Sequence, residues 1–151
     1  MVGNEFEPVE MIINKDNYFY GKTLKDFPNI KEAILRDCKQ DISVKDAIRY
    51  FKQGYKAIII TKEGKMNSWV DIDSMNKLMF LKKLKLSDSA LKTKNINYLT
   101  LPYDVDFSAV QKMLNDEPFA VLLKRDNEKN IENAWVVTKE DLLFKFLEES
   151  D

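Results

Sequence analysis

The chain has 151 residues, of which 44% are hydrophobic and 32% are charged, as expected for one ordinary globular domain or for two small units that share a core. Its formal net charge of −1 gives no reason to expect a nucleic-acid partner, and no stretch approaches the roughly 20 apolar residues of a membrane span. The first residues, MVGNEFEPVEM, are acidic where a secretory signal would be basic and then apolar. We therefore expect a cytoplasmic protein that does not bind membranes.

The composition also restricts the chemistry. The sequence has no histidine, which removes the commonest general base and most zinc sites. Cys38 is the only cysteine, so an intrachain disulfide and a thiolate metal cluster are excluded, and a reducing compartment fits. The four glycines are isolated, so no glycine-rich loop can wrap a phosphate. Acid–base catalysis by carboxylates alone stays possible, but no pair stands out, and we expect no metal site.

The first half of the chain predicts a helix, two strands and a second helix. Residues 42–53 should form a helix, because apolar residues recur at i, i+3, i+4 and i+7; these are Val44, Ala47, Ile48 and Phe51. The β-branched run at 57–61 is typical of a buried strand. A turn at 62–65 and a returning strand at 66–70 complete a hairpin. Residues 71–81 are then predicted to be helical, with three side chains facing inward: Met75, Leu78 and Met79.

The same order of elements recurs in the second half. Residues 105–116 predict a helix, with one apolar face made by Phe107, Val110 and Leu114. A strand is expected at 119–123, a polar hairpin loop at 124–133 and a second strand at 134–137. The chain then continues into a helix at 138–149.

The two halves overlay on each other. Ala57 aligns with Ala120, and Val70 aligns with Val137. The two separations differ by a few residues, and this difference falls in loops, as it does in duplicated folds. The chain is therefore predicted to contain two copies of one structural unit. Neither copy has enough core to be stable by itself, so the copies should pack sheet against sheet.

Each unit is entered by a short strand, predicted at 41–43 in the first copy and at 98–101 in the second. The fold class is thus α/β (α+β), with two β-α-β-β-α repeats related by pseudo-two-fold symmetry. The expected divisions are an N-terminal linker segment (1–28), the first repeat (29–82), an inter-repeat linker helix (83–97) and the second repeat (98–151).

Three segments carry a family resemblance: LKLSDSALK at 84–92, YLTLPYDVDFSAVQKMLNDEPFAVLLK at 98–124 and VVTKEDLLFKF at 136–146. Together with the tandem units, they resemble a pair of CBS domains, also called a Bateman module, over roughly residues 18–147. More narrowly, the chain resembles the C-terminal regulatory region of cystathionine β-synthases. The aromatic segment at 16–27 lies where the linker of those enzymes carries aromatic residues.

Thr138 and Asp141 lie three residues apart at the start of the last predicted helix. Taken alone, they form a capping box, in which a hydroxyl and a carboxylate satisfy the first N–H groups of the helix. In CBS repeats that bind ligands, Thr and Asp at these positions hold the ribose of an adenosyl group. The resemblance implies the same role here, because a carboxylate can accept hydrogen bonds from both hydroxyls of a cis-diol. The two roles are compatible.

The resemblance also implies the remaining walls of an adenosyl site between the repeats. The residues implied are Val136, Thr138, Glu140 and Asp141 of the second repeat, and Ala33, Leu35, Tyr55, Lys56 and Ala57 of the first. The segment around Tyr55 would form the opposite wall, and the entry segment at 33–37 would close the far side. Tyr55 by itself fits equally well as a packing aromatic.

The matching junction of the first repeat has different chemistry. Asp71 stands in place of the threonine, and Ser74 stands in place of the aspartate. A serine cannot act as a charged double acceptor. We therefore expect the pseudo-symmetric second cleft to be empty, so that the chain has one functional site.

The implied ligand is S-adenosylmethionine, acting as an allosteric effector and not as a catalytic cofactor. A polyphosphate nucleotide would need several cations or backbone nests; Lys56 and Lys139 could serve, but no glycine-rich geometry accompanies them. The alternatives are a CBS pair of another protein that senses AMP or ATP, and a ligand-free dimerisation module.

The expected role is regulatory and non-catalytic. Cystathionine β-synthases use pyridoxal phosphate, which needs a Schiff-base lysine and a phosphate cup that this chain cannot build. The partners implied are a second copy of the module, paired through the helix faces at 75–81 and 142–147, and the catalytic core of a parent cystathionine β-synthase.

Overall fold

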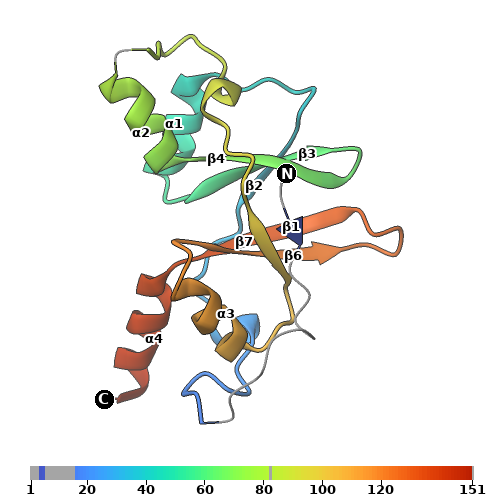
Figure 1. The fold of residues 1–151 in the computed structure, drawn as a ribbon, viewed down its shortest axis with the longest axis vertical. Helices are drawn as coiled ribbons and strands as arrows, with labels where there is room; N and C mark the ends of the chain where they lie inside the picture. Colours follow the sequence, from blue (N-terminus) through green and yellow to red (C-terminus); the bar gives the residue numbers. More distant parts are fainter. Residues whose placement is uncertain (1–3, 6–15, 82, 151) are drawn as a thin grey trace.

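The computed structural model describes residues 4–5, 16–81 and 83–150, and two β-sheets face each other at its centre (Figure 1). One sheet consists, in spatial order, of β2 (Ile34–Asp37), β3 (Ala57–Lys62) and β4 (Lys65–Asp71). The other consists of β1 (Asn4–Glu5), β5 (Leu99–Pro102), β6 (Ala120–Arg125) and β7 (Ile131–Val137). In both sheets the entry strand runs parallel to the next strand, and the hairpin strands are antiparallel. The predicted pair of repeats, packed sheet to sheet, is confirmed.

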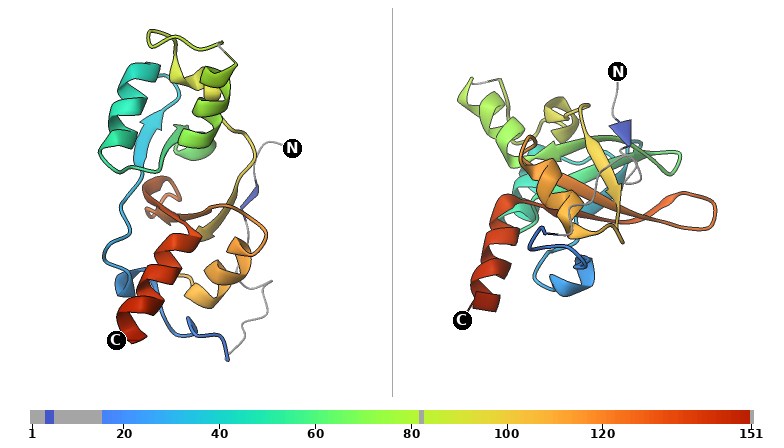
Figure 2. Two further views of the ribbon diagram at one scale, coloured as in Figure 1. Left: turned by 90° about the vertical axis from the view of Figure 1, so that its left-hand side faces the viewer. Right: turned by 60° about the horizontal axis from the view of Figure 1, so that its bottom comes forward.

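Each repeat places its two helices on the outer side of its own sheet. Helices α1 (Val44–Lys52) and α2 (Ile72–Phe80) lie at one end of the molecule. Helices α3 (Phe107–Leu114) and α4 (Lys139–Ser150) lie at the other end, as the left view of Figure 2 shows. The layers therefore run helix, sheet, sheet, helix, and the surface between the two sheets is the surface between the two repeats.

Local sequence explains the boundaries of the first repeat. The Ser43 side chain accepts a hydrogen bond from the backbone N–H of Asp46 and caps α1. The helix ends at Lys52, and Gly54 follows with a φ of +101°, a conformation that glycine adopts without strain. Glu63 and Gly64 both have positive φ between β3 and β4, as a tight hairpin turn requires. These turns make the strand at 57–61 and its partner a hairpin, as predicted.

Three apolar clusters form the core. One lies under α1 and α2, one lies between the sheets, and one lies between α3, α4 and their sheet. The cluster between the sheets joins side chains from both repeats, among them Ile59 and Trp69 from the first and Val121 and Val136 from the second. Burial of this apolar surface contributes about 25 cal/mol of stabilising free energy for each Å² removed from water, and this holds the two repeats together.

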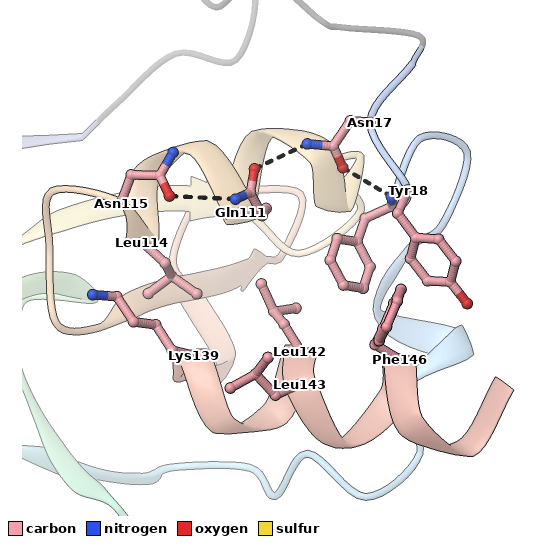
Figure 3. A pocket seen from close by; sticks show the side chains of 10 residues that line it. Asn17, Tyr18, Gln111, Leu114, Asn115, Lys139, Leu142, Leu143 and Phe146 are labelled. Atoms are coloured by element: carbon pink, nitrogen blue, oxygen red, sulfur yellow. Dashed lines mark hydrogen bonds between the residues drawn. The ribbon is translucent and has the colours of Figure 1, made fainter. Parts of the chain in front are cut away.

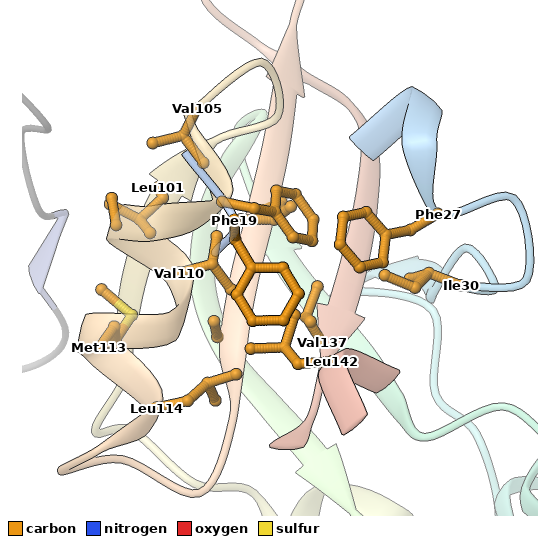
Figure 4. Packing of buried hydrophobic residues seen from close by; sticks show 14 residues of the cluster. Phe19, Phe27, Ile30, Leu101, Val105, Val110, Met113, Leu114, Val137 and Leu142 are labelled. Carbon is orange, nitrogen blue, oxygen red and sulfur yellow. The ribbon is translucent and has the colours of Figure 1, made fainter. Parts of the chain in front are cut away.

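The segment that precedes the first repeat packs on the second. Phe19, Phe27 and Ile30 are buried in the cluster beneath α3 and α4 (Figure 4), and the ring of Phe27 stacks on that of Phe107 at 4.2 Å. The backbone N–H of Phe107 donates to the carbonyl of Lys22. The aromatic part of the expected linker is thus part of the hydrophobic core of the second repeat.

Several local predictions are wrong. The entry strand of the first repeat is β2, and residues 41–43 lead into the cap of α1 instead. The hairpin loop is shorter than 124–133, because β6 continues to Arg125 and β7 begins at Ile131. Residues 83–97 hold the short 3-10 helix Ala90–Thr93 in place of a linker α-helix.

The inward face of α2 was also predicted too broadly. Met75 is buried as expected and Leu78 is partly buried, but Met79 is 45% exposed. The face of α2 that packs on the sheet is therefore narrower than the one predicted.

Candidate functional site

A cavity of about 380 Å³ opens between the two repeats, beside the start of α4. Five of its lining residues were implied by the sequence: Tyr55, Lys56, Thr138, Glu140 and Asp141. Five more complete the wall and were missed: Phe51, Gly54, Ile72, Phe119 and Phe144. Of these, Phe144 follows Asp141 by three residues, a helical spacing that could have indicated it.

Asp141 is the best-connected polar group of this cavity. Its Oδ2 atom accepts hydrogen bonds from the backbone N–H of Thr138 at 2.8 Å and from the Thr138 hydroxyl at 3.2 Å. The same atom lies 2.6 Å from the ammonium group of Lys56, which comes from the other repeat. The carboxylate therefore caps α4 and also joins the two repeats through an ion pair.

The other carboxylate oxygen of Asp141 is differently placed. Within residues 16–81 and 83–150, each hydrogen bond and ion pair of this side chain is made by Oδ2. The side chain is 16% exposed, so it is held firmly and still reaches the cavity. Oδ1 is thus available to accept a hydrogen bond from a ligand hydroxyl, while Oδ2 keeps its bonds at the start of α4.

Glu140 adds a second negative charge at the cavity. Its own backbone N–H, followed by the Thr138 hydroxyl and by Lys56 and Lys139, lowers the pKa of this carboxyl group below its usual value. The Thr138 hydroxyl itself donates a hydrogen bond to the carboxylate of Asp141. Among the described lining residues, the cavity therefore has two carboxylates, those of Glu140 and Asp141, and one ammonium group, that of Lys56.

Tyr55 forms the aromatic part of the opposite wall. The Lys31 ammonium lies 3.8 Å from the centre of its ring, and Tyr50 packs against it edge to face at 5.8 Å. The ring is therefore held by neighbours of its own repeat while it lines the cavity. An aromatic surface of this kind suits the apolar faces of a purine base.

The remaining implied residues lie in the core next to the cavity and are not part of its wall. Ala33, Ala57 and Val136 are buried in the cluster between the sheets, and Leu35 packs against that cluster. The backbone N–H of Ala33 donates to the carbonyl of Ala134 at 2.8 Å. The entry segment of the first repeat is thereby bonded to the last strand of the second, which fixes the spacing of the two walls.

The pseudo-symmetric junction differs in geometry as well as in sequence. Val70 pairs with Ile58 in the first repeat, and Val136 pairs with Val121 in the second. The structural equivalent of Val70 is therefore Val136, one residue before the Val137 that the sequence overlay predicts. As a result, Asp71 takes part in a strand pair with Ala57, is 3% exposed, and has one oxygen that finds no hydrogen-bond partner among the described residues.

Phe119 occupies the position that matches Lys56, because Ala57 and Ala120 are equivalent in their pairing. Its ring packs edge to face on Trp69 at 5.2 Å. The junction at Asp71 therefore has a phenylalanine where the junction at Asp141 has Lys56, and Phe119 also lines the cavity at Asp141.

A larger groove of about 470 Å³ lies between the N-terminal aromatic segment, α3 and α4 (Figure 3). Its wall is largely apolar, and the amide groups of Asn17, Gln111 and Asn115 bond to one another along its rim. Lys139 is the one charged side chain among the described lining residues of this groove, whereas the cavity at Asp141 has three: Lys56, Glu140 and Asp141.

Comparison with solved structures identifies the fold. The CBS domain pair of protein MJ0100, solved in complex with 5′-methylthioadenosine and S-adenosyl-L-methionine, superposes with a TM-score of 0.63 and 18% identity, over 85% of this chain and 98% of that one. The CBS-domain protein ATU1752 from Agrobacterium tumefaciens gives 0.60 and 11%, over 85% and 98%. The cytosolic domain of the Mg²⁺ channel MgtE, in complex with ATP, gives 0.51 and 16%, over 74% and 44%.

The fold is that of a CBS domain pair. Neither a family model nor a curated protein sequence matches the chain. Among the described residues, no helix has the length and apolar character needed to cross a membrane.

Proposed function

We propose that this chain is a regulatory CBS pair that binds one adenosyl ligand in the cavity between its repeats. The observation that supports this most is the placement of Thr138 and Asp141 at the rim of a cavity whose opposite wall is Tyr55 and Lys56. In the bound state, Asp141 accepts hydrogen bonds from the ribose diol, and Tyr55 contacts the adenine. The module has no catalytic role of its own.

The charges of the cavity favour S-adenosylmethionine as the ligand. Glu140 and Asp141 line the cavity together with Lys56, and Lys56 is already paired with Asp141. Such a site suits a ligand with a sulfonium cation. Lys139, the other candidate for a phosphate, lines the groove on the opposite side of α4. AMP or ATP is the second candidate ligand, supported by the proximity of Lys56.

The proposed module pairs with a second copy and regulates a larger enzyme. Helices α2 and α4, together with the residue that follows α2, expose several large apolar side chains: Ile72, Met79, Phe80, Leu81, Leu143, Phe144, Phe146 and Leu147. Burial of these faces would drive a homodimer. We propose a cytoplasmic cystathionine β-synthase as the parent enzyme, on the strength of the motif resemblance. Sedimentation of the chain at tens of micromolar tests the pairing, and a monomer there would contradict it.

Calorimetric titration with S-adenosylmethionine, AMP and ATP tests the ligand. We expect S-adenosylmethionine to bind at micromolar concentration and the two nucleotides to bind at least ten times more weakly. Tighter binding of AMP or ATP would favour an energy sensor. Absence of heat with all three ligands, together with a dimer in sedimentation, would leave only the dimerisation module.

A further inference from the structure

A second cavity adjoins the proposed adenosyl site. It has a volume of about 270 Å³ and lies between residues 27–30 and α4. Asp141 and Phe144 line both cavities. The space beside the proposed ribose position therefore continues along α4 towards its C-terminal end.

The residues along this face of α4 follow helical spacing. Asp141, Phe144, Lys145 and Glu148 occupy positions i, i+3, i+4 and i+7, and all four line the second cavity. With a rise of 1.5 Å per residue, Lys145 stands about 6 Å along the helix from Asp141, and Glu148 about 10 Å. The proposed ribose acceptor is thus followed by a cation and then by an anion.

Both charged groups retain the capacity to bind a ligand. The ammonium group of Lys145 lies 3.6 Å from Glu149 and 5.9 Å from the ring centre of Phe27, and the Lys145 side chain is 20% exposed. For Glu148, no hydrogen bond or ion pair is found among the described residues, and its side chain is exposed. A cavity that presents one ammonium and one carboxylate complements a group with the opposite pair of charges.

We propose that this second cavity binds the α-amino-acid end of the adenosyl ligand, with Lys145 holding its carboxylate and Glu148 its ammonium. This inference rests on the proposed function. The chain of five bonds from the ribose ring to the amino-acid carbon of S-adenosylmethionine spans about 6 Å when extended, since three bonds span ~3.8 Å. That length lets the amino-acid end extend from the first cavity into the second.

The two cavities together select among adenosyl compounds. S-adenosylmethionine and S-adenosylhomocysteine carry the zwitterionic end and fill both cavities. 5′-Methylthioadenosine has the same nucleoside without that end, and fills only the first. The phosphate of AMP would meet Lys145 but also the carboxylates of Asp141 and Glu148, so its affinity should be lower.

Calorimetry with these compounds on three variants tests the assignment. Lys145→Met removes the cation but keeps most of the side-chain volume, and Glu148→Gln removes the negative charge. Lys77→Met is the control, since Lys77 is an exposed residue of α2 that lines neither cavity. Thermal melting of each variant verifies that it is folded.

We expect the unaltered chain to bind S-adenosylmethionine and S-adenosylhomocysteine about 10-fold more tightly than 5′-methylthioadenosine. Lys145→Met and Glu148→Gln should each lower the first two affinities about 3- to 10-fold, because the groups are partly exposed and screened. Both should leave 5′-methylthioadenosine unchanged, and Lys77→Met should change nothing.

The possible failures are distinguishable. Equal affinities for 5′-methylthioadenosine and S-adenosylmethionine, unaffected by the variants, would overturn this inference and leave the proposed function standing. A loss of all three affinities in Lys145→Met or Glu148→Gln would assign those residues a structural role only. If the unaltered chain bound none of the three compounds, the proposed function would fail, and this inference with it.

Discussion

Asp141 is the side chain at which the helix cap, the inter-repeat ion pair and the proposed ribose site coincide. The substitution Asp141→Ala removes all three at once, and two measurements separate them. Melting of the unliganded chain reports the cap and the ion pair. Calorimetry with S-adenosylmethionine reports the ribose contact.

The loss of stability follows from the contacts of Oδ2. Removing the acceptor for the Thr138 N–H should cost about 1 kcal/mol, as for other N-terminal caps. The ion pair with Lys56 is partly exposed, with side-chain exposures of 33% and 16%, and adds at most about 1 kcal/mol. A loss of about 1–2 kcal/mol should lower the melting temperature by roughly 3–8 °C for a chain of this size.

The loss of affinity should be larger. A carboxylate that accepts from two ribose hydroxyls contributes about 2–4 kcal/mol, which is a loss of roughly 30- to 1,000-fold in affinity for S-adenosylmethionine. Since the unliganded fold is stable enough to tolerate the cap mutation, the titration is carried out well below the melting temperature of the variant.

Asp71→Ala is the control in the other repeat, because Asp71 immediately precedes α2, as Thr138 precedes α4, and its side chain is almost fully buried. We expect its effect on affinity to stay within about two-fold, below 0.5 kcal/mol. Equal losses of affinity in the two variants would refute the single-site model. Unchanged affinity in Asp141→Ala would leave Asp141 as a helix cap and ion-pair partner only.

Three further outcomes are expected. Lys56→Met should raise the affinity for S-adenosylmethionine about 2- to 5-fold in calorimetry, because it removes a cation near the proposed sulfonium position; a loss of affinity would mean that Lys56 contacts the ligand. The pKa of Glu149 is lowered chiefly by the hydrogen bond from the Tyr18 hydroxyl. This contact therefore stabilises the fold at pH values above the unfolded pKa of about 4.3, and the stabilisation is lost as pH falls through the lower folded pKa. In the variant Tyr18→Phe, carboxyl NMR titration should show the Glu149 pKa returning towards its usual value, and an unchanged pKa would exclude the contact. Gly64→Ala should cost about 1–3 kcal/mol in chemical denaturation, because φ is +77° and a Cβ atom would overlap the side chain of Asn130; the additional change Asn130→Ala should recover part of this loss, and full recovery would show that backbone strain contributes nothing.

The sequence by itself determined the features that depend on neighbouring residues. The apolar spacing from Val44 to Phe51 specifies a helix face wherever that helix packs, and the β-branched run from Ile58 to Ile60 specifies a strand. Because the two halves repeat this order, the paired architecture followed as well. Thr138 and Asp141 were identifiable for the same reason, since a helix start is a local pattern.

Only the tertiary structure decided which distant segments meet. The entry strand β2 pairs with β3, which lies more than 20 residues further along the chain. Because nothing local marks that pairing, the sequence did not distinguish residues 34–37 from the short run at 41–43 as the entry strand. The packing of Phe27 on the second repeat has no local signature.

The ion pair between Lys56 and Asp141, 85 residues apart, has none either. Contacts of this kind depend on how two sheets are positioned against each other, which is set by the summed burial of the apolar core. No short stretch of sequence contains the total apolar burial of the core. The helix cap at Asp141 was therefore predictable, whereas the ion pair of Asp141 with Lys56 and the second cavity beyond Phe144 were not.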